Sequence, residues 1–110
     1  MNPRDLDRLR DMLDEARRVM RFAEARPRSD FDTDEMLIYA IIHAIEIIGE
    51  AARHVTRETQ ALIPEIDWIA LTAMRNRLAH DYLHVDYDIV WSVVSVQVPE
   101  LISILEKHLP

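Results

Sequence analysis

Only one of the 110 residues in the chain is a glycine, Gly49. Tight hairpins between β-strands need residues that adopt positive φ, and glycine supplies most of them. A chain with so little glycine has few places for such turns, so we expect an all-α fold. The chain is long enough for one hydrophobic core but not for two, and 49% of its residues are apolar, as in a globular protein. We therefore expect a single domain over residues 1–110.

The first helix is predicted from residue 3 to near Pro27. Asn2 is a suitable cap for a helix, and Pro3 suits the first helical position because a proline there loses no hydrogen bond. Apolar residues then recur at intervals of three or four, which places them on one face of a helix. They are Leu6, Leu9, Leu13, Ala16, Met20 and Ala23.

A polar linker, residues 28–34, is rich in capping residues, and we expect a second helix to start within it and to reach about Val55. The centre of this helix, residues 36–48, is apolar on nearly every side, as in a helix in the middle of a bundle or covered by a second subunit. Its polar residues fall on one face: Tyr39, His43, Glu46, Glu50, Arg53 and Arg57. This polar line either flanks a cleft or subunit interface, or consists of residues that satisfy one another's hydrogen bonds.

Two more helices complete the predicted fold. The third begins at Glu65. The last segment is harder to assign, because residues 89–98 are rich in β-branched side chains and alternate in part like a strand. No other segment offers a strand to pair with it, so we interpret it as a helix that Pro99 kinks or locally breaks. The expected architecture is an antiparallel bundle of roughly four to five helices.

Composition and charge exclude several classes of protein. The chain has no cysteine, which excludes disulfides and thiolate metal sites. No apolar signal segment follows the N-terminus, and the apolar run at 36–48 is too short to span a bilayer. We therefore expect a cytoplasmic protein that is not embedded in a membrane. The net charge of −7 argues against a broad surface for nucleic acid.

Chemistry is most concentrated in residues 75–82, with the sequence RNRLAHDY. These residues lie towards the end of the third helix, where the helix dipole favours a protonated His80. The motif offers an arginine and a histidine but no serine nucleophile and no metal cluster. This combination suggests cleavage of RNA, because the ribose 2′-hydroxyl of RNA is itself the nucleophile and the protein need not supply one. His80 would transfer a proton, and Arg75 would stabilise charge on the phosphate oxygens. This scheme requires no metal and no cofactor.

The motif at residues 75–82 resembles the signature of the HEPN superfamily, and most closely that of the HepT-type toxins. The residues that carry the resemblance are Arg75, Asn76, Leu78, His80 and Tyr82. Further similarity lies at residues 48–52 (IGEAA), 64–68 (PEIDW) and 89–91 (IVW), and at Pro99. The resemblance covers most of the chain beyond residue 35.

The resemblance implies a single HEPN-like domain that forms a homodimer, with two copies of the motif facing one cleft. It implies an endoribonuclease toxin of a type VII-like toxin–antitoxin pair, whose antitoxin is a minimal nucleotidyltransferase. By position, Arg75 and His80 would be catalytic and Asn76 would orient them. Tyr82 would receive AMP from the antitoxin, which would add bulk and negative charge close to the site that binds RNA.

Other interpretations remain open for the same residues. Arg75 and His80 would also fit a surface ion-pair network with Asp81, and Arg77 fits either an RNA-backbone contact or a solvated arginine. Glu50 is the candidate to support Arg75. His80 and His84 have the spacing of a zinc pair, but no third ligand is evident, so we expect no metal. The alternatives to a nuclease are a non-catalytic module that binds a nucleotidyltransferase, and a purely structural dimer.

Overall fold

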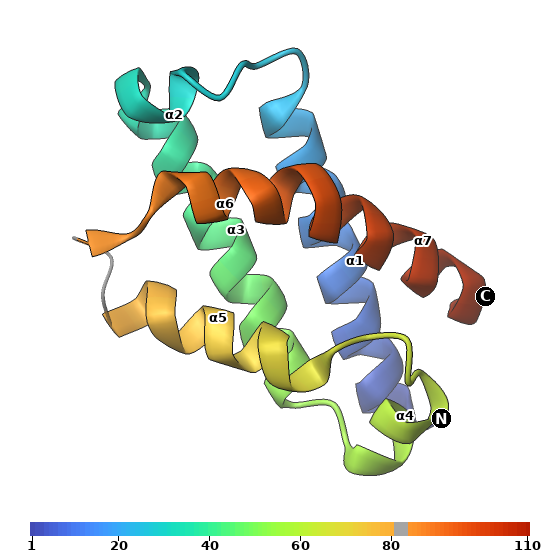
Figure 1. The fold of residues 1–110 in the computed structure, drawn as a ribbon. Coiled ribbons are helices and arrows are strands. Elements are labelled where there is room, and N and C mark those ends of the chain that lie inside the picture. The colour runs from blue at the N-terminus through green and yellow to red at the C-terminus, as the bar shows by residue number, and fades with distance from the viewer. Residues whose placement is uncertain (81–83) are drawn as a thin grey trace.

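The computed structural model describes residues 1–80 and 84–110, and within these ranges it contains helices and no strand (Figure 1). The all-α prediction is therefore confirmed. The helices are α1 (Pro3–Ala23), α2 (Asp30–Thr33), α3 (Glu35–Arg53), α4 (Arg57–Leu62), α5 (Trp68–His80) and a continuous C-terminal helix. This last helix consists of α6 (Tyr87–Ser92), a π-helical turn (Val93–Gln97) and α7 (Val98–His108).

Helix α3 lies in the middle of the bundle, as its apolar centre predicts. It runs antiparallel to α1 on one side and packs against α5 on the other, while the C-terminal helix packs across α1 (Figure 1). Ten residues of α3 are buried, among them Ile38, Ile41 and Ile48. The core is thus built mainly between α1 and α3, and α5 is attached to the outside of this pair.

The start of α1 agrees with the prediction, and its end does not. Asn2 caps the helix by accepting a hydrogen bond from the Asp5 backbone N–H at 2.8 Å, and Pro3 is the first helical residue. The helix ends at Ala23 rather than near Pro27. The reason is local, because Ala25 adopts a left-handed conformation with φ of 58° that a helix cannot continue through.

The segments that join the predicted helices each contain a short helix, α2 and α4, and the third predicted helix begins later than expected. Residues 30–33 form α2, which buries Phe31 against the edge of Trp91, with ring centroids 5.2 Å apart. Asp34 then caps α3 through the Leu37 backbone N–H. The third predicted helix begins at Trp68 rather than Glu65.

An unexpected buried carboxylate joins α1 to α4. Asp5 is 1% exposed and accepts hydrogen bonds from Thr56 N at 3.1 Å, Thr56 Oγ1 at 2.6 Å and Thr59 Oγ1 at 2.5 Å. Burial alone raises the pKa of Asp5, but these hydrogen bonds outweigh it and hold the pKa below its ordinary value. Because Thr56 also caps α4, Asp5 fixes the segment that leads into α5.

The ambiguous segment at 89–98 is helical, as we interpreted it, and Pro99 shapes it without ending it. Proline has no N–H to donate, and its ring clashes with the carbonyl four residues earlier. The helix accommodates Pro99 by widening, so the Val98 N–H bonds to the Val93 carbonyl in the π-helical turn. The whole segment, Tyr87–His108, is long and apolar enough to cross a membrane, a test that core helices of soluble proteins also pass. Here its buried side chains belong to the core.

Candidate active site

The helix that carries the 75–82 motif touches α3 at the chain's only glycine. A Cβ atom at Gly49 would collide with Cβ of Arg75 and would come within 2.9 Å of the Leu71 carbonyl oxygen. Only glycine allows α5 to approach α3 this closely. Gly49 therefore sets the position of α5, and with it the position of Arg75.

Glu50, the next residue of α3, faces the same arginine. Its Oε2 atom lies 3.0 Å from Nε of Arg75. Its Oε1 atom accepts a hydrogen bond from Nη2 of Arg53 at 3.0 Å and lies 3.0 Å from Nε2 of His54. One carboxylate thus joins two guanidiniums and an imidazole, and Arg75 is the only one of the three that comes from another helix.

The two oxygens of Glu50 differ in their bonding. Oε1 is hydrogen-bonded, whereas the buried Oε2 has no hydrogen-bond donor among the described residues. The 3.0 Å approach of Arg75 is therefore an ion pair without hydrogen-bond geometry. Arg75 instead uses Nη1 to donate to Oδ1 of Asn76 at 3.1 Å. Its guanidinium is held near Glu50 by charge and is oriented by its neighbour in the motif.

The pKa of Glu50 is lowered to about 2 by these contacts. The hydrogen bond from Arg53 is the largest cause and that from His54 the next, while burial opposes them and the charge of Arg75 adds a smaller effect. Glu50 is therefore negatively charged throughout the range in which ribonucleases work. A permanent negative charge gives Arg75 a fixed counter-ion.

The structure places the two expected catalytic residues on different sides of α5. Arg75 is 30% exposed and faces α3, whereas His80 is exposed at the last position of the helix. Five residues along an α-helix correspond to a rotation of about 140°, which accounts for this separation. Between the described residues of one chain, no hydrogen bond or ion pair joins Arg75 to His80.

The remaining site residues are placed as follows. Asn76 is exposed beside Arg75 and has the geometry that an orienting residue needs. Arg77 is exposed and lines a small hollow of about 60 Å³ with His84 and other residues. Asp81 and Tyr82 lie outside the described residues.

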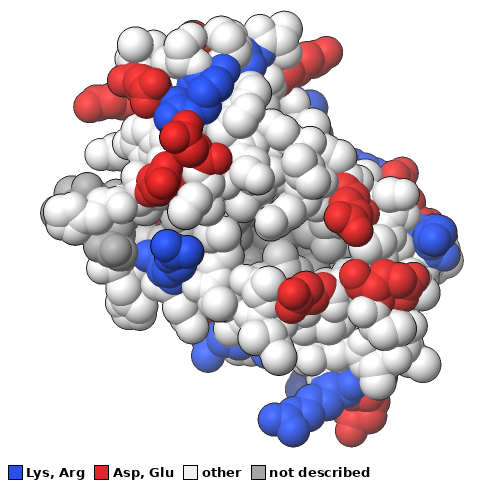
Figure 2. Space-filling model, viewed as in Figure 1, with Lys and Arg blue, Asp and Glu red and all other residues white. Residues whose placement is uncertain are grey.

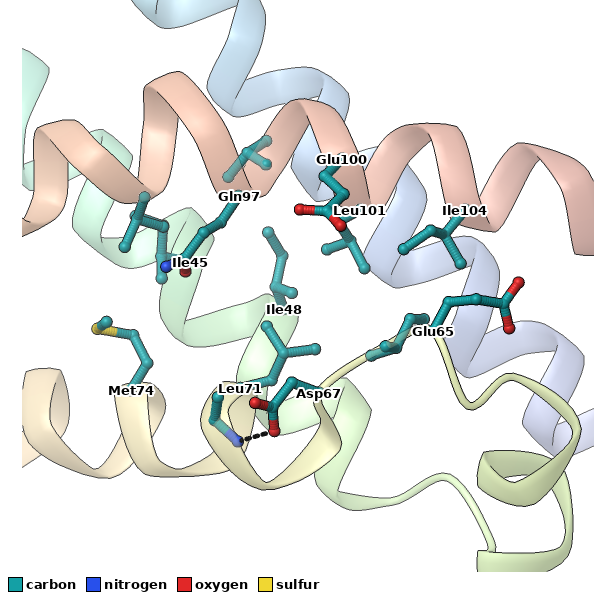
Figure 3. Close-up of a pocket in the computed structure, with 14 residues that line it drawn as sticks. Ile45, Ile48, Glu65, Asp67, Leu71, Met74, Gln97, Glu100, Leu101 and Ile104 are labelled. Atoms are coloured by element: carbon teal, nitrogen blue, oxygen red, sulfur yellow. Dashed lines mark hydrogen bonds between the residues drawn. The ribbon is translucent and has the colours of Figure 1, made fainter.

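A larger hollow, of about 260 Å³, lies between α5 and the C-terminal helix, with α3 at its floor (Figure 3). Its lining includes Ile45, Leu71 and Leu101, and three of its lining residues are acidic: Glu65, Asp67 and Glu100. Carboxylates are also visible beside the hollow in the space-filling view of this face (Figure 2). None of the predicted site residues lines it. An apolar hollow with acidic borders does not suit a phosphate, so the motif and this hollow are separate features.

The sequence predicted Glu50 as the support for Arg75, and the structure brings the two together, but two further features of this contact were not predicted. His54 was not among the candidates, although it lies four residues after Glu50 and therefore on the same helical face. Gly49 was used only as a sign of the fold class and as part of a similar segment. Its role depends on the contact between α3 and α5, which no periodicity in the sequence reveals.

Comparisons with known proteins show which family the chain resembles. Residues 12–108 match the model of a family described as "Ribonuclease HepT-like". The chain is 34% identical over 102 residues to "Putative RNase MJ1380" of Methanocaldococcus jannaschii, covering 92% of this chain and 94% of that protein. It is 34% identical over 101 residues to "Probable ribonuclease HepT" of Thermococcus cleftensis, covering 92% of each. A comparison with solved structures found no match.

Proposed function

The chain belongs to the HepT-like ribonuclease family, and from this membership we propose that it is a metal-independent endoribonuclease that acts in the cytoplasm as the toxin of a type VII-like toxin–antitoxin pair. The single observation that carries the proposal is the placement of Arg75. Gly49 brings it against α3, and Glu50 holds it 3.0 Å away as a fixed counter-ion. A positioned guanidinium is what a transition state with charge on phosphate oxygens requires.

The proposed reaction uses the RNA's own nucleophile. The ribose 2′-hydroxyl loses its proton to a base and attacks the adjacent phosphorus, and the bond to the 5′-oxygen breaks as that oxygen gains a proton. The products are a 2′,3′-cyclic phosphate and a free 5′-hydroxyl. In this scheme Arg75 stabilises the charged phosphorane oxygens, and His80 transfers one of the two protons. Asn76 orients Arg75, and Arg77 contacts the RNA backbone.

We propose that the active unit is a homodimer. Because Arg75 and His80 of one chain diverge around α5, a second copy of the motif across a shared cleft would bring a histidine to each arginine. Exposed apolar side chains on the outer face of α3 support an interface there. Met36 is 85% exposed and Tyr39 67% exposed in the single chain, and large apolar residues exposed in this way often mark a contact surface. Two-fold symmetry is the commonest form of such pairing.

Neutralisation would act on Tyr82, two residues after His80. In the proposed system a minimal nucleotidyltransferase antitoxin transfers AMP from ATP to the tyrosine hydroxyl, which loses its proton as it attacks the α-phosphorus and pyrophosphate leaves. The added phosphate places negative charge beside the site for the RNA backbone and repels it, and the nucleoside adds bulk. Loss of RNA binding would therefore follow from modification of a residue that takes no part in proton transfer.

Two observations favour a second candidate function, a non-catalytic module that binds a nucleotidyltransferase. Arg75 already has a carboxylate partner in Glu50, and the chain carries a net charge of −7. Both features weaken the attraction of the surface for RNA. In that case the motif would position a substrate for the partner enzyme and would cleave nothing itself.

RNA cleavage by the purified protein in EDTA distinguishes the two functions. We expect wild-type protein to cut RNA in EDTA and the His80→Ala variant to lose at least a hundredfold in rate, since general acid–base catalysis contributes about 10²–10⁴-fold. His84→Ala, which removes a neighbouring histidine outside the motif, is the matched control and should retain activity. Equal cleavage by wild type and His80→Ala would contradict the proposal, and complete loss of wild-type activity in EDTA would point to a metal.

A further inference from the structure

Basic residues outside the first part of the chain are concentrated near the proposed active site. Residues 29–110 contain fourteen acidic residues and only five basic ones. Four of these five lie between the end of α3 and the C-terminal half of α5, and the fifth is Lys107. The four are Arg53, Arg57, Arg75 and Arg77. Nearly all of the positive charge of residues 29–110 thus lies within one stretch of the chain, and two of its arginines, Arg53 and Arg75, meet where α3 contacts α5.

Two of these arginines meet at one carboxylate. Nη2 of Arg53 donates a hydrogen bond to Oε1 of Glu50, and Nε of Arg75 lies beside Oε2, each at 3.0 Å. The two arginine side chains are therefore neighbours although they come from different helices. Together, Arg53, Arg75 and Glu50 carry a net charge of +1, without any contribution from His54. The Arg53 side chain is 50% exposed and that of Arg75 is 30% exposed, so both are accessible.

We propose that Arg53 is an RNA-binding residue that contacts a backbone phosphate next to the phosphate held at Arg75. The inference rests on the proposed nuclease function and assigns a second phosphate subsite to it. A guanidinium has five N–H donors in a planar fork, and the hydrogen bond to Glu50 uses one of them. The others suit the oxygens of a phosphate.

Glu50 and His54 act as positioning residues for this subsite. Because Glu50 restrains the Arg53 side chain, less conformational freedom remains to be lost when a phosphate binds. His54 holds the same carboxylate oxygen from the next turn of α3, at 3.0 Å. The same carboxylate thus fixes the separation between the two guanidiniums, and with it the separation of the two phosphates that the site accepts.

Salt-dependent binding of an uncleavable RNA tests the subsite. The probe is a single-stranded RNA with 2′-O-methyl groups, which lacks the nucleophile and remains intact during titration. The variant is Arg53→Gln, which keeps a hydrogen-bond donor for Glu50 and removes the charge. We expect roughly fivefold weaker binding at low salt, and a slope of log K against log salt that is smaller by about 0.7, the value for one phosphate contact to a single strand.

Arg18→Gln is the matched control, because Arg18 pairs with Glu15 at the same i, i+3 spacing on the first helix and is 46% exposed. It changes the net charge equally and should leave the slope unchanged. Arg53→Lys retains the charge and should keep the wild-type slope, which separates loss of a phosphate contact from a disturbance of Glu50. Circular dichroism checks that each variant is folded.

The outcomes separate this inference from the proposed function. If wild type cleaves RNA and His80→Ala does not, but Arg53→Gln and Arg18→Gln give the same slope, the subsite is wrong and the nuclease stands. A reduced slope for Arg53→Lys as well would also overturn it, since the charge alone should suffice. If wild type neither cleaves RNA nor binds the probe, both proposals fail together.

Discussion

The α1–α3 pair and helix α5 are held in the fold in different ways. Helices α1 and α3 bury six and ten residues respectively, and each is capped at its start by an asparagine or aspartate side chain. Helix α5 buries only Leu78, and its closest attachment to the pair is the contact at Gly49. Among the four long helices α1, α3, α5 and α7, the motif thus lies on the one with the fewest buried residues. Stability and the proposed activity therefore depend on largely separate residues, so mutations can change one without the other.

The largest effect on stability is expected in the core, at a buried residue of α3. Ile41 of α3 is 0% exposed, and replacing it with alanine leaves a cavity, so we expect Ile41→Ala to lose about 2–5 kcal/mol of unfolding free energy. Ile69→Ala is the matched control on α5, where the isoleucine is 84% exposed, and should cost less than about 0.5 kcal/mol. Urea denaturation followed by circular dichroism measures both. Equal losses would show that α5 is as deeply packed as α3.

An intermediate effect is expected where the two regions meet. Gly49→Ala places a methyl group against Arg75 and the Leu71 carbonyl, so α5 must shift. Overpacking of this kind costs about 1–3 kcal/mol, and alanine recovers about 1 kcal/mol through its better helix propensity. RNA cleavage should fall at least tenfold, because a shift of about 1 Å in a catalytic group has large kinetic effects. Ser103→Thr, which adds a methyl group at an exposed position of α7, should change neither quantity. Unchanged cleavage by Gly49→Ala would show that the contact does not position Arg75.

The smallest effect on stability, with a distinct effect on activity, is expected at Glu50. Glu50→Gln removes the counter-ion of Arg75, and we expect roughly tenfold slower cleavage. The melting temperature should change little, because the Arg75 and Glu50 side chains are 30% and 38% exposed and solvent screens such ion pairs. Glu46→Gln, one turn earlier on α3, is the control. Comparing the two variants shows whether the contact with Arg75 matters. An equal loss of cleavage in both would mean that the negative charge of α3 matters in general, and that the contact between Glu50 and Arg75 does not.

The pH dependence of the melting temperature gives a second test of the role of Glu50. The pKa of Glu50 is lowered from 4.5 to about 2 in the folded chain. A lowered folded pKa means that the carboxylate stabilises the fold fully above about pH 4.5 and progressively less as the pH falls towards 2. The difference in melting temperature between wild type and Glu50→Gln, although small, should therefore shrink over this interval. A difference that grows on acidification would contradict the ionised assignment.

The sequence was informative where structure is set by neighbours along the chain. The apolar periodicity of residues 6–23 and the capping residue Asn2 predicted α1, and the apolar centre of the second helix predicted the central place of α3 in the bundle. Scarcity of glycine predicted the absence of hairpins, and the lack of a partner strand correctly resolved the β-branched segment before Pro99. Each of these inferences needs only helix geometry and the hydrogen-bonding needs of the backbone.

Features that depend on contacts between distant segments were not predictable in this way. Asp5 looks like an ordinary acidic residue in a first helical turn, and its burial is favourable only because Thr56 and Thr59 arrive from a segment about fifty residues away. Gly49 gained its role in the site in the same manner, through its contact with α5. The π-helical turn likewise reflects how Pro99 is accommodated inside a packed helix.

The closeness of α3 and α5 at Gly49 also determines how the protein responds to random mutation. Every other amino acid carries a Cβ, so each substitution at this position meets the same obstruction, whatever the chemistry of its side chain. If the protein is toxic to the cell that makes it, survivors of its overproduction should repeatedly carry changes in this one codon while still accumulating soluble protein. A residue without a side chain would thus be among the most frequent positions at which the activity is lost.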